Sequence, residues 1–244
     1  MELKRPTRAF TMMELLVVLA IIALLMSIIL PALHQAKDAA RSIQCKSLMK
    51  NYSLALYSYF LETNHLLPIS VQDWDQGIVM HPWHSLDEFR GLLDLQPTGS
   101  EYRDRHIGEL EEYTPAFERR FICPSAGYAL SHDREGLYPM NHSYGLNAEV
   151  YDYEFYVRPR LESQSGRIPC MADAMDWWFN YWQCDKYLDY GENWVGFETY
   201  GTAAFRHRDK ANVSYWDGHV DQMTAVELKT YMKEWLDIVR SGNP

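Results

Sequence analysis

The first 33 residues, MELKRPTRAFTMMELLVVLAIIALLMSIILPAL, decide how the rest of the chain is interpreted. A short basic leader runs into an apolar segment, residues 15–33, in which Ser27 is the only polar side chain. As an α-helix this segment would measure roughly 28 Å, which is close to the hydrocarbon thickness of a bilayer. Because basic flanks stay on the cytoplasmic side of a membrane, the sequence predicts that everything downstream is exported.

Glu14 stands at the start of this apolar segment, where an unpaired carboxylate is costly. The stretch AFTMME, from Ala9 to Glu14, is followed by LLVVLAIIA and resembles the type IV prepilin signal, which pseudopilins of type II secretion also carry. The resemblance implies that a prepilin peptidase cleaves between Ala9 and Phe10 and that Phe10 becomes the N-methylated first residue. Glu14 and Pro31 then fall where pilins carry Glu and Pro, whereas Ala9 replaces the usual Gly.

The charge of Glu14 suggests a role in assembly. A carboxylate in lipid needs a cation, and the new amine of Phe10 in a neighbouring subunit would supply one and set the axial register of packed helices. The alternative is a signal anchor or a cleaved secretory signal, but residues 28–33 offer no convincing signal peptidase site. We therefore predict a prepilin leader at residues 1–9 and a transmembrane and assembly segment at residues 10–33. The partners implied are prepilin peptidase, other pilin-like subunits and the inner membrane.

The helical pattern continues beyond the membrane segment. Apolar positions recur at roughly helical spacing through residues 34–62, and neither Gly nor Pro interrupts this range. The sequence therefore predicts one helix from about residue 10 to about residue 62, with an amphipathic second half. An exported globular domain is expected to follow at residues 63–244.

The exported part has mixed secondary-structure signals. Beyond residue 121, short runs of β-forming residues alternate with turns, and the chain ends in a predicted helix that Thr224 and Glu227 begin with a capping-box pattern. The predicted buried face of this helix comprises Val226, Tyr231, Trp235, Leu236 and Val239. The expected fold class is α+β and pilin-like, with the long N-terminal helix packed on a small antiparallel sheet and a C-terminal helix.

The composition disfavours several classes of function. The 244-residue chain carries a net charge of −10, and removal of the leader, with three basic residues and one acidic residue, would leave −12. Nucleic acid is therefore not an expected partner, since binding it requires a basic surface. No P-loop, G-x-S-x-G, H-E-x-x-H or G-x-G-x-x-G motif occurs, so no enzyme is predicted.

Four cysteines, Cys45, Cys123, Cys170 and Cys184, are candidates for disulfides. Export to an oxidising compartment would permit disulfides, whereas buried free thiols are the equally open alternative. No C-x-x-C pair occurs, which disfavours a structural zinc site. The sequence does not determine the pairing.

A second motif lies near the C-terminus, where nine residues separate His207 from Asp217 and Gly218. This spacing resembles the H-X9-DG signature of a group of prepilin-like proteins. Other pieces of that group's pattern match RSIQCKSL around Cys45, FICPS around Cys123, SYGLN at residues 143–147 and Asp173 in PCMAD. The resemblance therefore spans nearly the whole chain.

Two interpretations of this motif remain open. Asp217 and Gly218 match a two-residue type I′ hairpin, and turn chemistry alone explains the pair. The alternative is a polar or metal site, in which His207, Asp173 and Asp217 lie close together at one edge of the sheet. We expect such a cluster to be held by hydrogen bonds rather than by an ion.

Calcium is a further possibility, because some pseudopilins hold it in a loop near the C-terminal sheet. The acidic candidates are Asp173, Asp176, Asp185, Asp189 and Glu192. No D-x-D-x-D-G loop occurs, and a solvated acidic loop is the simpler interpretation. We predict no cofactor, and calcium near Asp173 and Asp217 stays open.

Residues 174–200 are rich in aromatic side chains, among them Trp177, Trp178, Phe179, Tyr181, Trp182 and Trp194. Buried, these rings would fill a core, whereas exposed they would suit sugars or a partner protein. The sequence predicts a pseudopilin-like structural subunit of a type IV pilus or type II secretion-like assembly. The alternative is a pilin-anchored binding protein that recognises glycans or a partner through this segment. In both cases we expect a single pass through the inner membrane, with the C-terminal domain in the periplasm or in an extracellular filament.

Overall fold

The computed structural model describes residues 11–67, 70–73, 78–95, 119–131, 142–152, 161, 165–192 and 199–241. The chain divides into two units, residues 1–40 and 41–244. The predicted leader, Ala9, Phe10 and Trp194 lie outside the described residues. The predicted segment boundaries therefore stay predictions.

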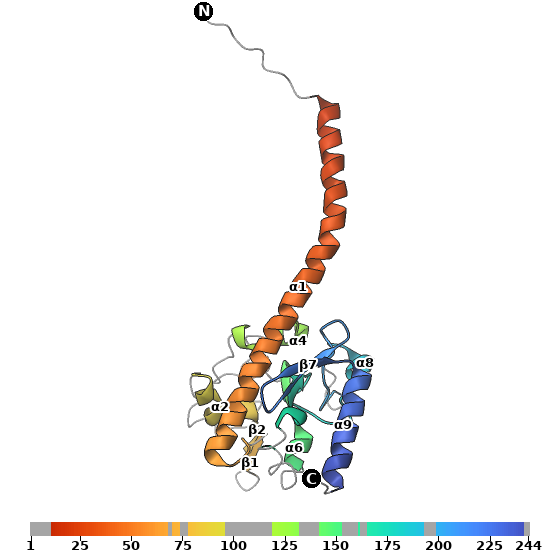
Figure 1. Ribbon diagram of the computed structural model, residues 1–244. Helices are drawn as coiled ribbons and strands as arrows, with labels where there is room; N and C mark the ends of the chain where they lie inside the picture. The colour runs from red at the N-terminus through yellow and green to blue at the C-terminus, as the bar shows by residue number, and fades with distance from the viewer. Residues whose placement is uncertain are drawn as a thin grey trace, which may run out of the picture. The chain divides into compact units, whose positions relative to one another are not determined.

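Helix α1 runs from Met12 to Thr63 and confirms the long N-terminal helix (Figure 1). Pro31 lies inside the helix and does not end it. Every residue of α1 up to Ala40 is exposed, including the whole apolar segment. Within the described chain, α1 is the one helix long and apolar enough to cross a membrane.

A five-stranded sheet forms the centre of the second unit, in the order β5-β3-β4-β6-β7. Its strands are β3 (Tyr144–Asn147), β4 (Pro169–Asp173), β5 (Trp178–Phe179), β6 (Ala211–Tyr215) and β7 (Val220–Met223). All pairs are antiparallel except β3 with β5, which is parallel because the chain reverses after β4 and adds β5 on the far side of β3. The α+β pilin-like class is confirmed, although the sheet is mixed rather than wholly antiparallel.

Several short elements surround this sheet. A separate antiparallel pair consists of β1 (Ser70–Asp73) and β2 (Ile78–Pro82). Within the described ranges, the short α-helices are α2 (Asp87–Leu92), α4 (Gly127–Ser131), α6 (Ala148–Asp152) and α8 (Tyr187–Tyr190). The 3-10 turns of the same ranges are η1 (Trp83–Ser85), η3 (Arg119–Phe121) and η4 (Ser165–Arg167).

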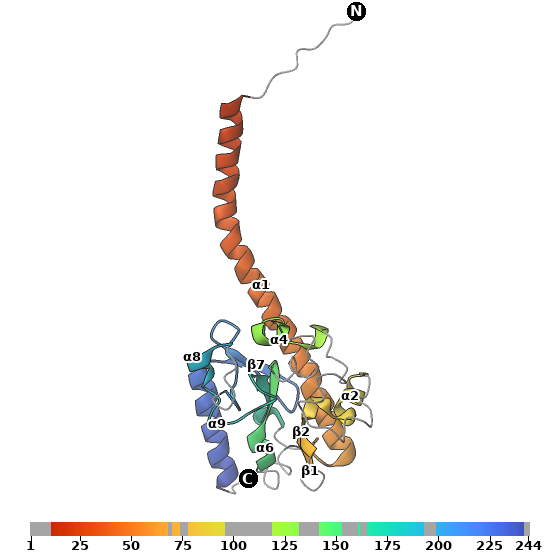
Figure 2. The same cartoon turned by 180° about the vertical axis from the view of Figure 1, so that it is seen from behind.

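The sheet lies between the second half of α1 and the C-terminal helix α9 (Ala225–Arg240), as Figures 1 and 2 show. Alternate residues of β6 point to opposite faces of the sheet. Ser214 meets α1, where its hydroxyl is 2.6 Å from that of Ser53, whereas Val213 and Tyr215 pack in the cluster that includes Leu228 of α9. The buried residues of α1 recur at helical spacing and are Cys45, Met49, Tyr52, Ser53, Leu56 and Phe60.

The hairpin between β6 and β7 differs from the predicted type I′ turn. Gly218 has a positive φ of 84°, but Asp217 does not. The amide of Gly218 donates to the carbonyl of Tyr215 at 2.9 Å, and the amide of Tyr215 donates to the carbonyl of His219 at 3.0 Å. This pattern is a three-residue loop with a left-handed glycine bulge, which needs only one residue with positive φ.

The C-terminal helix begins as predicted, because Thr224 and Glu227 form both halves of a capping box. Its buried face is shifted from the prediction and comprises Ala225, Leu228, Met232, Trp235, Leu236 and Val239. Val226 is 74% exposed, so its assignment to the core was wrong. Ala225, the first residue of the helix, packs instead in the cluster that includes Val213 and Tyr215 of the sheet.

Candidate functional site

Glu14 is held by its own helix in the first unit. The backbone amide and the hydroxyl of Thr11 each donate to Glu14 Oε2 at 2.9 Å, and the amide of Glu14 donates to Thr11 Oγ1 at 3.2 Å. This reciprocal arrangement is a capping box, which satisfies donors at the helix N-terminus. The T-x-x-E signal was present in the sequence, but its role at this position was missed.

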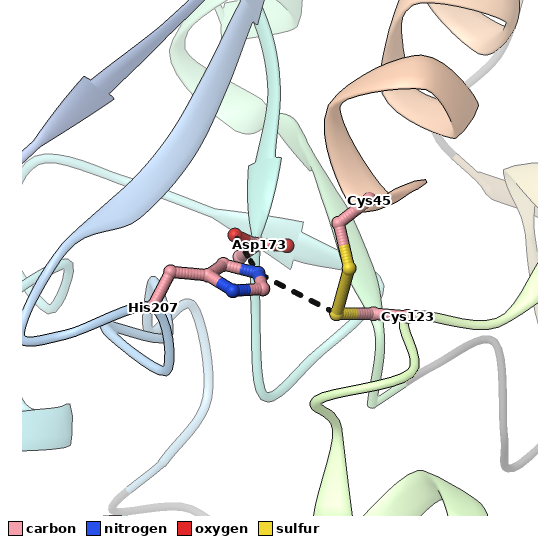
Figure 3. A group of neighbouring side chains, drawn as sticks. All are labelled: Cys45, Cys123, Asp173 and His207. Carbon is pink, nitrogen blue, oxygen red and sulfur yellow. Dashed lines mark hydrogen bonds and ion pairs between the residues drawn. A yellow bond between two sulfur atoms is a disulfide. The ribbon is translucent and has the colours of Figure 1, made fainter. Parts of the chain in front are cut away.

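In the second unit, a buried group brings together Cys45, Cys123, Asp173 and His207 (Figure 3). His207 Nε2 lies 3.3 Å from Asp173 Oδ2 and 3.7 Å from Cys123 Sγ. Cys45 comes from α1, Cys123 follows η3, Asp173 ends β4, and His207 precedes β6. Four segments that are distant in the sequence therefore meet at one place.

Two local features hold His207 and Asp173 in position. The amide of His207 donates to the carbonyl of Lys210 at 3.0 Å, and the intervening Arg208 and Asp209 have φ values of 55° and 60°. Two consecutive left-handed residues are typical of a type I′ turn, so this turn chemistry occurs beside His207 rather than at the predicted hairpin. Asp173 Oδ2 also accepts a hydrogen bond from the amide of Asn212 at 2.8 Å, which ties β4 to β6.

Several buried polar atoms lack hydrogen-bond partners in the described part of the chain. Among them are Asp173 Oδ1 and the hydroxyl oxygen of Tyr144. Tyr144 lies directly opposite Asp173 in the β3–β4 register. Burial, and then the charge of Asp173, raise the pKa of Tyr144 well above its usual value. Unsatisfied buried polar groups are uncommon and costly, so they mark this region as unusual.

The structure joins Cys45 and Cys123 in a disulfide with a Cα–Cα distance of 5.2 Å. It leaves Cys170 and Cys184 as buried thiols. Burial raises the pKa of each of these two thiols to about 12. Because the thiolate is the reactive form, Cys170 and Cys184 are expected to be inert.

Arg206 is a structural residue that the sequence reasoning missed. Its side chain is 2% exposed, and Nε donates to Glu192 Oε1 at 2.8 Å. Its terminal nitrogens donate to the carbonyls of His142, Ser143 and Ala174. Burial favours the neutral form, but the charges of Glu192 and Asp173 outweigh it and raise the pKa of Arg206. The position of Arg206 directly before the candidate His207 was the sequence feature that could have indicated its role.

Asp217 does not join His207 and Asp173, so the predicted three-residue cluster was wrong in this respect. Asp217 Oδ1 lies 2.6 Å from His219 Nδ1 and accepts from the amide of His219 at 3.0 Å. His207 precedes β6 and Asp217 follows it. The five residues of this strand would separate its ends by roughly 15 Å.

The described acidic candidates for calcium are held by different partners. Asp185 faces Lys229 at 3.1 Å, Asp189 faces Lys186 at 3.7 Å, and Glu192 faces Arg206. Asp176 accepts from the amides of Trp177 and Gly201. These four carboxylates do not converge on one another, and calcium binding near Asp173 and Asp217 stays a prediction.

The described rings of the aromatic segment are mostly packed. Phe179 is fully buried, and the carbonyl of Trp177 accepts from the indole of Trp83 at 2.6 Å. Trp178 and Tyr181 are partly buried. Trp182 is 62% exposed. The described part of the segment therefore contributes chiefly to the core, and Trp182 is its exposed ring.

Comparison with known proteins identifies the N-terminal segment. Residues 4–30 match the prokaryotic N-terminal methylation motif. No curated protein and no solved structure matches the chain. The motif and the long apolar helix together support a type IV pilin-like protein that prepilin peptidase processes. The resemblance to the H-X9-DG group stays a prediction.

Proposed function

We propose that this protein is a pseudopilin-like structural subunit of a type IV pilus or type II secretion-like assembly. Prepilin peptidase removes residues 1–9, and the mature chain starts at N-methylated Phe10. The apolar part of α1 spans the inner membrane once, and the second unit is exported. The protein acts by assembly with other pilin-like subunits and not as an enzyme.

The observation that carries this proposal is the methylation motif at residues 4–30, which overlaps the part of α1 from Met12 to Leu33 whose apolar residues are all exposed. Exposed apolar surface of this extent needs either lipid or other subunits to cover it. A pilin-like subunit uses both, because its helix resides in the membrane before assembly and packs against other helices afterwards.

The charge of Glu14 is the feature that separates a pseudopilin from a simple membrane anchor. The capping box with Thr11 gives Glu14 a partner within its own helix, so capping alone would explain the residue. In the proposed assembly, the carboxylate also pairs with the amine of Phe10 in a neighbouring subunit. The two roles require different properties, since a capping box accepts Gln as well as Glu, whereas the ion pair requires a charge.

Three variants of the full chain distinguish these roles. We expect Glu14→Gln to insert into membranes normally and to reduce cross-linked oligomers several-fold, because it keeps the cap and loses the charge. Thr11→Ala is the matched control, because it weakens the cap and keeps the charge, and it should assemble nearly normally. Glu14→Ala should assemble no better than Glu14→Gln. Normal assembly of Glu14→Gln, measured by cross-linking in native membranes, would show that the charge has no register role.

The second candidate is a binding protein displayed on the same anchor. The exposed ring of Trp182 favours this role, because aromatic rings stack on sugar faces and fill partner pockets. The aromatic residues next to Trp182 are packed, which favours a structural role for this segment. Trp182→Ala tests the alternative, since a binding role predicts normal assembly with lost glycan or partner capture.

A further inference from the structure

The group around His207 contains the donor atoms of a zinc site. One ligand atom each from Cys45, Cys123, Asp173 and His207 lies within 4.8 Å of every other. All four residues are buried, and Figure 3 shows the imidazole of His207 facing both the carboxylate and the sulfur of Cys123. Thiolate and imidazole ligands favour zinc over calcium, which binds through oxygen.

Two distances between donor atoms of this group suit a tetrahedral ion. With Zn–N and Zn–O bonds of about 2.0–2.2 Å and Zn–S bonds of about 2.3 Å, neighbouring donor atoms lie roughly 3.3–3.8 Å apart. His207 Nε2 lies 3.3 Å from Asp173 Oδ2 and 3.7 Å from Cys123 Sγ. Both distances fall in this range. The two sulfurs are bonded in the disulfide and would have to separate before they could bind an ion.

The unpartnered oxygen of Asp173 is the second, independent observation. Asp173 is fully buried, and its Oδ1 has no hydrogen-bond partner among the described residues. A disulfide has no proton to donate, so the sulfurs do not satisfy this carboxylate. Arg206, a nearby cation, directs its hydrogen bonds to Glu192 and to backbone carbonyls. A divalent ion would supply the missing charge.

We propose that Cys45, Cys123, Asp173 and His207 bind one Zn²⁺ when the two cysteines are reduced. The disulfide and the zinc site are alternative states of the same sulfurs. A phosphine reductant converts one into the other: the disulfide takes up two electrons and two protons, and the phosphine becomes its oxide with oxygen from water. Zinc then displaces the two thiol protons, so its binding weakens as the pH falls.

Either state would tie α1 to the sheet, since Cys45 belongs to the helix and Asp173 to β4. The lack of a C-x-x-C pair does not count against this site, because its ligands come from four separate segments. Cys170 and Cys184 are not members of the group and provide matched controls.

The test uses the full chain in detergent, purified with a phosphine present throughout and then dialysed against Zn²⁺. We expect one zinc per chain by mass spectrometry of the metal, and a higher melting temperature than in the chelator-treated protein. The disulfide form should retain no zinc after the same dialysis. Cobalt in place of zinc should give a thiolate-to-cobalt charge-transfer band. Cys170→Ala and Cys184→Ala should leave both signals unchanged, whereas Cys123→Ser and His207→Gln should lose them.

X-ray absorption at the zinc edge keeps the test independent of whether these variants fold. The unmodified reduced protein should show two sulfur neighbours at about 2.3 Å and two nitrogen or oxygen neighbours at about 2.0–2.2 Å. A zinc shell without sulfur would overturn the proposal. Zinc content in the reduced protein no higher than in the disulfide form would overturn it as well.

Discussion

Asp176 shows at the scale of one residue how burial changes chemistry. Its carboxyl group is buried beside the aromatic residues, and this burial raises its pKa to about 7 despite hydrogen bonds from the amides of Trp177 and Gly201. The folded protein therefore holds the proton more tightly than the unfolded chain does. The stabilising contribution is complete below the unfolded pKa of about 4 and is lost as the pH rises through about 7.

We expect Asp176→Asn to flatten the dependence of stability on pH. The amide keeps an acceptor for the amide of Trp177 and removes the charge. Between pH 5 and pH 7 the unmodified chain should lose up to about 1.4 kcal/mol per pH unit through this group. Thermal unfolding of the detergent-solubilised chain at several pH values measures this slope. The exposed Asp189→Asn is the control, and equal slopes for Asp176→Asn and the unmodified chain would refute the explanation.

The candidate site was only partly predictable at the residue scale. His207 and Asp173 were singled out from motif spacing, and they do lie together. Asp217 was grouped with them because of its spacing from His207, but a strand of five residues intervenes. The convergence of Cys45 and Cys123 depends on a contact between residues 78 apart, which no local pattern encodes.

At the scale of the element, the β6–β7 hairpin depends on Gly218. Its φ of 84° is unfavourable for any residue with a Cβ atom. A Cβ atom placed there would also lie 2.7 Å from the side chain of Leu54 on α1. The glycine therefore allows both the bulge and the close approach of the helix.

Gly218→Ala should destabilise the protein by about 1–3 kcal/mol, through backbone strain and the contact with Leu54. For a domain of this size that corresponds to a fall of roughly 2–12 °C in melting temperature. Leu54→Ala should reduce the additional cost of Gly218→Ala without abolishing it, because only the contact is relieved. Equal costs of Gly218→Ala in both backgrounds would show that Leu54 does not restrict this position.

The two long helices, α1 and α9, were predictable from the sequence because their signals are local. The apolar periodicity predicted α1, and the T-x-x-E pattern predicted the start of α9. The parallel pair of β3 and β5 and the type of hairpin were not predictable. Both depend on how distant segments pack, including the approach of Leu54 to Gly218.

At the scale of the whole molecule, the two units carry different functional and structural features. The first unit carries the methylation motif and the apolar helix, on which the proposed function rests. The second unit carries the sheet, the disulfide and the buried ion pair of Arg206 with Glu192. Processing of the leader is therefore the event on which the account of the whole molecule depends.

The mass of the mature N-terminal peptide tests this central claim most directly. Protein purified from membranes of cells that contain a prepilin peptidase should lack residues 1–9 and should begin with N-methylated Phe10. An Ala9→Gly variant, which restores the residue usual in prepilins, should be processed at the same bond at least as completely. A mature protein that retains Met1, or one that begins beyond Leu33, would contradict the account.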